Sequence, residues 1–254
     1  MANQDLFYSV QLTTPLGEIR GKVAVQDAPM RLAEVVPTAL DLTNILVQQA
    51  IKKEQALGRQ ISCGPGCGMC CRQMVPVSPP EAFYIMDLLD FMAPNTRAEL
   101  MARFNAIEKV LQKRGMITPL MSPEYTDDPV LAVAKQYYTL NLECPFLTNE
   151  SCSIYRYRPV VCREYNVTSS PEHCKNPYTL EVEKVSIPLA LSAVLSRLTA
   201  RLTHTKPRLI PLSLVPYWVS KVGELRWRQW PGAELFQTFM SFVGPSSHEQ
   251  GVAA

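Results

Sequence analysis

Eight cysteines are the residues of this 254-residue chain whose type and spacing could do chemistry. Four of them lie in one short run, which reads Cys63-Gly-Pro-Gly-Cys67-Gly-Met-Cys70-Cys71. The other four follow within a single second stretch, at Cys144, Cys152, Cys162 and Cys174. A deprotonated thiol is a strong ligand for zinc and for iron–sulfur clusters. The two blocks therefore predict a site for a soft metal or an iron–sulfur cluster.

The spacing within the first block is suited to shared ligation. Cys67 and Cys70 are three positions apart, which lets two thiolates reach one metal, and Cys63 brings a third thiol near. Cys71 directly follows Cys70, and because successive side chains diverge, such neighbours fit one tetrahedral ion poorly. Eight thiols could fill two four-thiolate zinc sites, ligate two clusters, or hold one centre with some cysteines left over. The spacing does not choose among these arrangements.

Other interpretations of the cysteines are weaker. An even number of cysteines also fits a disulfide framework, and an isolated residue such as Cys174 also fits inert packing in a core. The spacing of Cys63, Cys67 and Cys70 equals the one used by radical-SAM enzymes. Those enzymes usually carry an aromatic residue where this chain has Met69, and the strand–helix alternation of their barrel is missing after the motif. We therefore prefer a metal site outside that fold.

The composition bounds the class of protein. The chain is 47% hydrophobic and 19% charged with a net charge of +2, which is typical of a globular protein of one large or two small domains. Basic residues are scattered, so no nucleic-acid partner is expected. The first residues lack the features of a signal peptide, and the apolar stretch 185–195 is too short to span a bilayer. We expect a soluble cytoplasmic protein with no membrane partner, in which clustered thiols remain reduced.

Hydrophobic periodicity and capping signals outline the elements that must position the cysteines. Residues 6–12 and 18–25 predict a β-hairpin, and Ser78 with Glu81 forms a capping box at the start of a helix. Asn95 is expected to cap a further helix that ends before Gly115. The remaining helices are expected over residues 31–57, 129–140 and 180–203, with two more between 206 and 244, while 245–254 are expected to be frayed.

These elements predict a mainly α fold with a small N-terminal β-hairpin and an irregular cysteine-rich metal-binding middle. Residues 1–60 would form the hairpin and a helix, residues 61–178 the cysteine-cluster domain, and residues 179–254 a helical segment packed on it. The loops that carry the ligands must then close over the long gap between Cys71 and Cys144. We expect a metal to tie these distant segments together.

The motifs around the cysteines resemble those of a known family. Arg72 follows the first block, and Val77-Ser78-Pro79-Pro80-Glu81 begins the next helix. The second block contains Cys144-Pro145-Phe146-Leu147, Cys152-Ser153-Ile154-Tyr155 and Arg158-Pro159-Val160-Val161-Cys162-Arg163. In this order the chain resembles the YkgJ-type cysteine-cluster family of zinc- or iron-chelating domains. The resemblance covers about residues 61–176 and implies that all eight cysteines are metal ligands, with zinc or an iron–sulfur cluster as the cofactor.

The resemblance implies chelation rather than a settled reaction. The family also takes in proteins similar to flagellin lysine-N-methylase, so the alternative is an enzyme that uses the cluster, either a protein lysine N-methylase-like protein or an iron–sulfur oxidoreductase. No separate S-adenosylmethionine motif is evident in the chain. The expected partners are a metal ion or cluster and a protein partner or substrate, and whether the protein is an enzyme stays open.

Two arginines flank the cysteine of the last motif. Arg158 and Arg163 could offset the negative charge of a thiolate site and donate hydrogen bonds to it. The alternative is that one of them holds a carboxylate or phosphate of a substrate. We favour the first role and expect both arginines to lie beside the cofactor.

Overall fold

The computed structural model describes residues 5–122, 127–244 and 246–252. Its α-helices are α1 (Val36–Ala56), α2 (Pro79–Asp90), α3 (Pro94–Lys113), α4 (Ile117–Met121), α5 (Asp127–Thr139), α6 (Val160–Glu164), α7 (Leu191–Thr203), α8 (Val215–Lys221), α9 (Gly223–Trp227) and α10 (Gly232–Val243). The short 3₁₀ helices are η1 (Leu32–Val35), η2 (Met69–Arg72), η3 (Tyr155–Tyr157), η4 (Pro171–Lys175) and η5 (Leu212–Leu214). The prediction of a mainly helical protein with an irregular middle is confirmed. No helix of the described ranges is long and apolar enough to cross a membrane.

The strands form one small sheet and three short pairs. The sheet is antiparallel with the order β2-β1-β9, built from β1 (Asp5–Thr14), β2 (Gly17–Gln26) and β9 (Ser246–Val252). The pairs are β3 (Pro29–Arg31) with β8 (Gln229–Pro231), β4 (Pro76–Val77) with β7 (Ile210–Pro211), and β5 (Leu147–Thr148) with β6 (Ser151–Cys152). The predicted N-terminal hairpin is β1–β2 and is confirmed.

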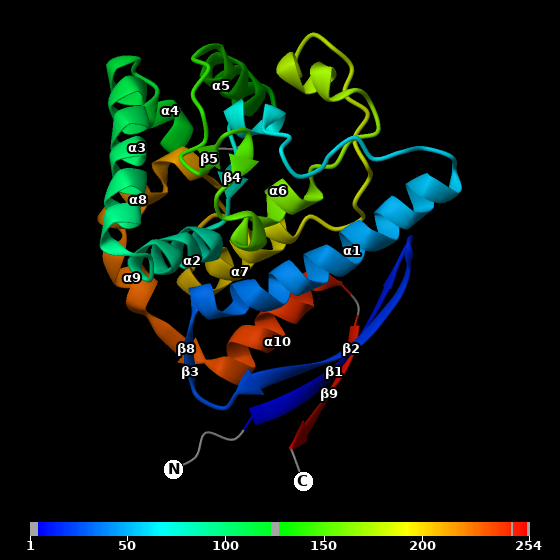
Figure 1. The fold of residues 1–254 in the computed structure, drawn as a ribbon. Coiled ribbons are helices and arrows are strands. Elements are labelled where there is room, and N and C mark those ends of the chain that lie inside the picture. Colours follow the sequence, from blue (N-terminus) through cyan, green and yellow to red (C-terminus); the bar gives the residue numbers. More distant parts are fainter. Residues whose placement is uncertain (1–4, 123–126, 245, 253–254) are drawn as a thin grey trace.

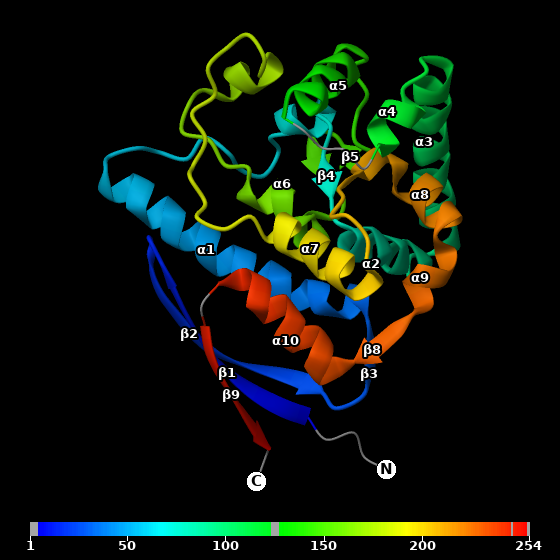
Figure 2. The same ribbon diagram turned by 180° about the vertical axis from the view of Figure 1, so that it is seen from behind.

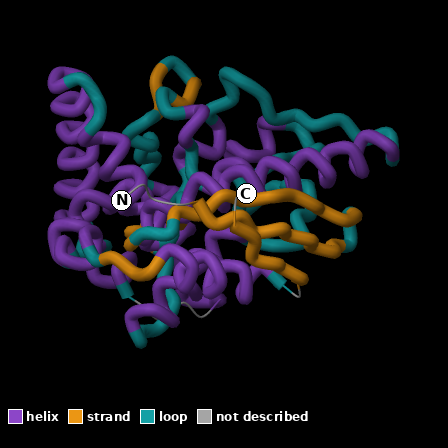
Figure 3. Tube along the Cα trace, turned by 90° about the horizontal axis from the view of Figure 1, so that it is seen from below, coloured by secondary structure: helices purple, strands orange, loops and turns teal. Residues whose placement is uncertain are grey.

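The helices lie on one side of this sheet, at increasing distance from it. Helices α1 and α10 both pack against β2, and the ring of Tyr8 in β1 lies 4.7 Å from that of Phe236 in α10. Figures 1 and 2 show α2, α6 and α7 beyond these helices, and α3, α4 and α5 at the end of the molecule farthest from the sheet. Figure 3 shows the sheet from below, spread across one side of the helices. The cysteine-bearing loops lie in the far half, between α1 and α5.

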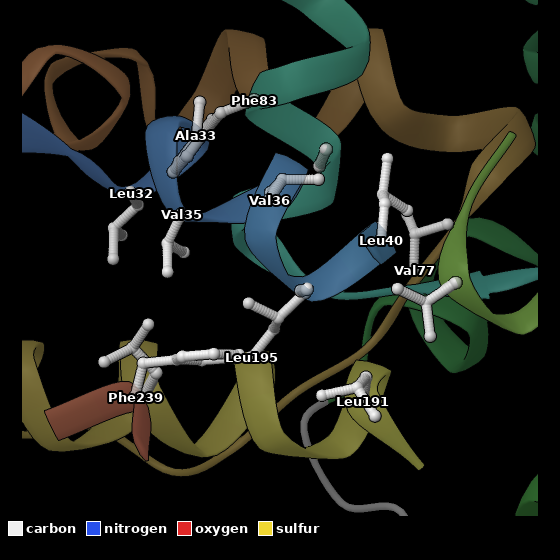
Figure 4. Packing of buried hydrophobic residues seen from close by; sticks show 14 of the residues in the cluster. Leu32, Ala33, Val35, Val36, Leu40, Val77, Phe83, Leu191, Leu195 and Phe239 are labelled. Atoms are coloured by element: carbon white, nitrogen blue, oxygen red, sulfur yellow. The ribbon is translucent and has the colours of Figure 1, made fainter. Parts of the chain in front are cut away.

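A single large hydrophobic cluster joins the two halves. Figure 4 shows its centre, where side chains of η1 and α1 meet those of α2, α7 and α10. Leu32, Phe83, Leu195 and Phe239 are each fully buried there. The cluster runs from Leu6 to Val243 in sequence. The cluster contains residues from both ends of the chain, so the fold that positions the cysteines has an extensive hydrophobic core.

The helix predicted over residues 180–203 is wrong in its first half. Only α7 (Leu191–Thr203) is helical, and the residues before it are extended. Thr168 donates its amide to the carbonyl of Glu183, Val185 donates to Asn166, and Val167 pairs with Lys184 as an isolated bridge. Pro188 cannot continue a helix, so the preceding backbone groups are satisfied by strand-like pairing instead.

Two smaller predictions are also corrected. Asn95 lies inside α3, which begins at Pro94 after Ala93, because proline is well suited to the first helical turn. Residues 246–252 were expected to be frayed but form β9, which pairs with β1 from Leu6↔Val252 to Leu12↔Ser246. Their sequence has no apolar alternation, and the pairing depends on the free backbone groups along β1. Residues 245, 253 and 254 lie outside the described part of the chain.

The core position of α2 yields a first prediction. Phe83 is fully buried and its ring lies 5.2 Å from that of Trp218, whereas Phe91 at the end of the same helix is 91% exposed. We expect Phe83→Ala to lower the free energy of unfolding by about 3–5 kcal/mol, since it removes a large buried side chain and leaves a cavity. Phe91→Ala is the matched control and should change it by less than about 0.5 kcal/mol. Urea denaturation of both variants measures the difference, and equal effects would contradict the placement of Phe83.

Candidate metal centre

All eight cysteines line one cavity of about 320 Å³. They come from three parts of the chain: the loop and η2 after α1, the segment from the end of α5 to α6, and η4. In Figures 1 and 2 the segment after α1 lies beside β5 and α6, although the sequence separates them by several helices. Tertiary packing therefore gathers the thiols of both blocks around a common space.

Glycines shape the loop that carries the first block. Gly66 has a positive φ of +84°, which turns the chain between Cys63 and Cys67. At Gly68 a β-carbon would lie 2.5 Å from a carboxylate oxygen of Glu150 and 2.8 Å from Leu147. A side chain at Gly68 would thus push the two cysteine blocks apart.

The two blocks are joined by contacts that involve no thiol. The amide of Cys144 donates to the carbonyl of Cys71 over 2.8 Å. Arg72 donates to both carboxylate oxygens of Glu150, over 3.1 and 2.7 Å, and to Glu143 over 2.7 Å. Bidentate pairing of arginine with a carboxylate fixes geometry as well as charge. These bonds set the distance between the blocks without any help from a metal.

The hairpin β5–β6 presents Cys152. Leu147 pairs with Cys152 across a two-residue turn, in which Asn149 and Glu150 both have positive φ, at +51° and +57°. This is the backbone pattern of a type I′ hairpin turn, which follows the natural twist of the strands. Glutamate is unusual in that conformation, and the ion pair with Arg72 holds it there.

Helix α6 presents Cys162 through a buried carboxylate on α2. Glu81 is 1% exposed and accepts hydrogen bonds from the amide of Ser78, the hydroxyl of Ser78 and the amide of Val160, at 2.9, 2.6 and 2.9 Å. The bond from the amide of Ser78, together with the bond from the amide of Glu81 to the hydroxyl of Ser78, forms the predicted capping box, which is confirmed. The bond from Val160 satisfies the first amide of α6, so the same carboxylate orders both helix starts.

Cys63 and Cys174 are placed by the extended pairing described above. Ser62 donates its amide to the carbonyl of Val167, and the thiol of Cys63 lies 3.9 Å from the carbonyl of Tyr165. Helix η4, which contains Cys174, packs against η2. Cys174 is buried, while the other seven cysteines are partly exposed. The isolated last cysteine thus reaches the same cavity as the first block.

Electrostatic influence places Cys174 with two thiols of the first block. Burial raises the pKa of Cys174 to about 11, and the thiols of Cys63, Cys70 and Cys67 add to the rise. Burial also raises the pKa of Cys63, with further contributions from Cys67 and Cys70. Thiolates influence one another in this way only when they are close. We call Cys63, Cys67 and Cys174 the first thiol group.

The remaining thiols form a second group. Burial raises the pKa of Cys144 to about 12, with Cys152 and Cys70 contributing. Burial raises the pKa of Cys162 well above its usual range, and the thiols of Cys144, Cys70 and Cys152 raise this pKa further. We call Cys144, Cys152 and Cys162 the second thiol group. Cys70 acts on both groups, and its own pKa is raised first by its hydrogen bond with Cys71 and then by burial.

The two predicted arginines have different surroundings. Arg158 lines the cavity, its guanidinium carbon lies 4.2 Å from the centre of the Tyr155 ring, and its charge lowers the pKa of thiols in both groups. Its Nε is buried without a hydrogen-bond partner. Arg163 is not among the residues that line the cavity and donates instead to the carbonyls of Arg158 and Arg156 and to Asn44 of α1.

The sequence analysis did not single out three further polar residues of the cavity: Gln73, Tyr165 and Lys184. Lys184 was assigned to a helix, and only the extended pairing with Val167 turns it toward the cavity. The proximity of Gln73 and Tyr165 to the cysteines in sequence was the available signal for these two residues.

The donor set fits a thiolate-ligated metal. All eight cysteines are free thiols, and zinc and iron–sulfur clusters both take four thiolates per centre. Across residues 5–122, 127–244 and 246–252, no three Cys, His, Asp or Glu side chains already meet as ligands of one ion. The thiols surround the cavity instead, so ligation requires side-chain rotations toward a common point.

The fold and the site together define a class: a mainly helical protein with its thiols gathered at one internal cavity. Residues 62–183 match the family model described as "CxxCxxCC: Putative zinc- or iron-chelating domain". Over these residues the chain is similar to this cysteine-cluster family, in agreement with the family that the motifs indicate. No curated protein and no solved structure matches the chain.

The raised thiol pKa values predict how the metal-free protein responds to pH. The pKa of a free thiol is about 8.5. A thiol whose pKa is higher in the folded protein stabilises the fold at pH values below about 8.5, and this stabilisation is lost as the pH rises toward the higher pKa. For Cys144 the loss extends up to its folded pKa of about 12. We expect the free energy of unfolding of metal-free protein to fall between pH 8 and 10, by up to about 1.4 kcal/mol per pH unit for each such thiol.

Urea titrations at several pH values measure this dependence. Cys144→Ser is the comparison, because removal of one buried thiol should make the decline with pH less steep whatever it does to the stability at pH 7. A stability that stays constant from pH 8 to 10, or a slope that the substitution leaves unchanged, contradicts the assignment.

Proposed function

We propose that this protein binds metal at two four-thiolate centres, of zinc or of iron–sulfur type, in the cysteine-lined cavity. The observation that carries the proposal is that all eight cysteines, from three separate parts of the chain, line that one cavity. The family model, which describes zinc- or iron-chelating domains, supports it. A thiol-lined cavity of this kind is a poor solution for packing alone, because eight buried or half-buried thiols each forgo better apolar contacts.

The electrostatic grouping of the thiols suggests how the ligands divide. Cys63, Cys67 and Cys174 would serve one centre, and Cys144, Cys152 and Cys162 would serve the other. Each group then lacks one ligand, and the adjacent pair of Cys70 and Cys71 would supply one thiolate to each. Consecutive side chains diverge, so two neighbouring cysteines are well suited to face two different centres. This division gives the adjacency of Cys70 and Cys71 a function.

Metal binding must be coupled to proton release. Burial raises the pKa of thiols in both groups, so these side chains hold their protons in the metal-free protein. A thiol ligates as the thiolate, and a bound cation supplies the positive charge that makes the thiolate stable in the cavity. Zinc would serve as a structural ion in a closed four-thiolate site, whereas iron–sulfur clusters would allow electron transfer.

Arg158 would complete the site on the protein side. We infer that its guanidinium offsets the thiolate charge and that its unpartnered Nε donates to a ligand sulfur. Arg163 would act indirectly, by holding the segment that carries Arg158. Its bonds to the carbonyls of Arg158 and Arg156 and to Asn44 fix the loop that presents Arg158 to the cavity.

Metal analysis of protein prepared without oxygen tests the centres. We expect zinc or iron in an amount that corresponds to two centres per chain, and a visible absorption band only if iron–sulfur clusters are present. Cys67→Ser and Cys152→Ser should each remove about half of the metal, because each takes a ligand from a different four-thiolate set. Ser62→Ala, beside the first block, is the control and should retain all of it. Protein that holds no stoichiometric metal under these conditions refutes the proposal.

Chelator competition tests the role of Arg158. We expect Arg158→Gln to weaken metal binding by about 10–100-fold at constant pH, because partners that orient and neutralise ligands commonly contribute that much. Arg158→Lys should recover part of the loss, since it restores the charge but not the guanidinium geometry. Arg156 is exposed nearby, and Arg156→Gln serves as the control for a general charge effect. Equal affinities for Arg158→Gln and Arg156→Gln would contradict this role.

A further inference from the structure

The cavity also carries three polar side chains that are not among the proposed metal ligands. Gln73, Tyr165 and Lys184 all line it. The amide nitrogen of Gln73 and the hydroxyl of Tyr165 are both buried, and neither has a hydrogen-bond partner. The ammonium of Lys184 lies 5.1 Å from the centre of the Tyr165 ring. The three side chains are thus grouped around Tyr165.

The unpaired atoms need an explanation. A buried donor left without a partner costs about 1–3 kcal/mol, and such groups are rare in native proteins. The amide of Gln73 and the thiol of Cys174 both adjoin the hydroxyl of Tyr165 closely enough to influence its pKa, which burial raises, yet neither the amide nitrogen nor the hydroxyl has a partner at hydrogen-bond geometry. An amide nitrogen and a phenol hydroxyl are both donors at neutral pH. A ligand that accepts hydrogen bonds would satisfy them.

Lys184 adds a positive charge to this part of the cavity. Lys184 is exposed, which places it at the cavity mouth, and no carboxylate forms an ion pair with it among the described residues. Its neighbour Glu183 accepts a hydrogen bond from the hydroxyl of Thr168 instead. Glu150 also lines the cavity, but Arg72 occupies both of its oxygens. A ligand that enters past Lys184 therefore meets an unopposed cation.

The remaining wall and the volume indicate the size of the ligand. Val75, Val167 and Leu212 add apolar surface beside the polar group. The whole cavity, which the proposed metal centres would share, has about 320 Å³ and lies at the lower end of the range for small-molecule sites, so the ligand must be small. A four-thiolate zinc site is closed by its own ligands and leaves no open position, so it does not by itself require a mouth lined by a lysine.

We propose that Lys184, Gln73 and Tyr165 bind the anionic group of a small molecule, a carboxylate or a phosphate, beside the metal centres. Lys184 attracts the anion at the mouth, and the amide of Gln73 and the hydroxyl of Tyr165 donate to it inside. The apolar residues contact the rest of the molecule. The proposal rests on the proposed function only in that the ligand would lie next to bound metal.

Titration calorimetry on metal-loaded protein tests this site with two probes, butyrate for a carboxylate and inorganic phosphate for a phosphate. We expect saturable binding of at least one of them, and the stronger probe identifies the anion. Lys184→Gln and Tyr165→Phe should each weaken binding about tenfold or more, which corresponds to the loss of one hydrogen bond to a charged group. Lys22 is exposed in β2, at the opposite end of the molecule, and Lys22→Gln is the control with the same loss of charge.

The outcomes separate this inference from the proposed function. Absence of saturable binding for both probes overturns the anion site, as does binding that Lys184→Gln and Lys22→Gln affect equally. If Lys184→Gln lowers the metal content while neither probe binds, the lysine serves the metal centres and the inference also fails. Metal analysis of the same samples keeps the two questions apart, because metal-loaded protein that binds no anion leaves the proposed function intact.

Discussion

The junction between the two cysteine blocks is the constraint on which the rest of the site depends. It consists of one backbone hydrogen bond, from Cys144 to Cys71, and the ion pairs of Arg72 with Glu150 and Glu143. Helices α2 to α5 lie between the two cysteine blocks in sequence. Closing so long a loop has an entropic cost, which the hydrophobic core offsets. The fold therefore gathers the thiols around one cavity, and ligation of a metal would still require them to rotate toward a common point.

This arrangement decides what metal binding would change. In the metal-free fold burial keeps thiols such as Cys144 and Cys174 protonated, and Arg158 and Lys184 are cationic side chains that line the same cavity. The core from Leu6 to Val243 reaches the cysteine loops through Phe146 and Ile154, and Cys144 and Cys152 pack against it. Loading of the proposed centres would thus exchange protons for metal at the cavity and strengthen the links between three loops, without creating the core. The same buried environment that disfavours thiolates would favour a neutralising cation.

Local sequence signals predicted correctly those elements whose stabilising contacts are with residues close in sequence. The β1–β2 hairpin, the capping box of Ser78 and Glu81, and the end of α3 before Gly115 all depend on neighbours within a few residues, and all were predicted correctly. The helix expected from residue 180 failed because its first half is held by residues 166–168, which are remote in sequence. Strand β9 was missed for the same reason, since only the free edge of β1 makes residues 246–252 a strand. Local propensity cannot report pairing partners that lie far along the chain.

The sequence by itself identified the eight cysteines, the soft-metal chemistry that they predict and the motifs of the cysteine-cluster family, because these follow from residue type and from spacing within short motifs. The tertiary structure alone decided which thiols are neighbours: it placed Cys174 with Cys63 and Cys67, and Cys162 with Cys144 and Cys152. It also separated Arg158, which faces the cavity, from Arg163, which holds the loop to α1. The physical reason is that a motif specifies the ligands a segment can offer, whereas the packing of distant segments determines which of those ligands share a site.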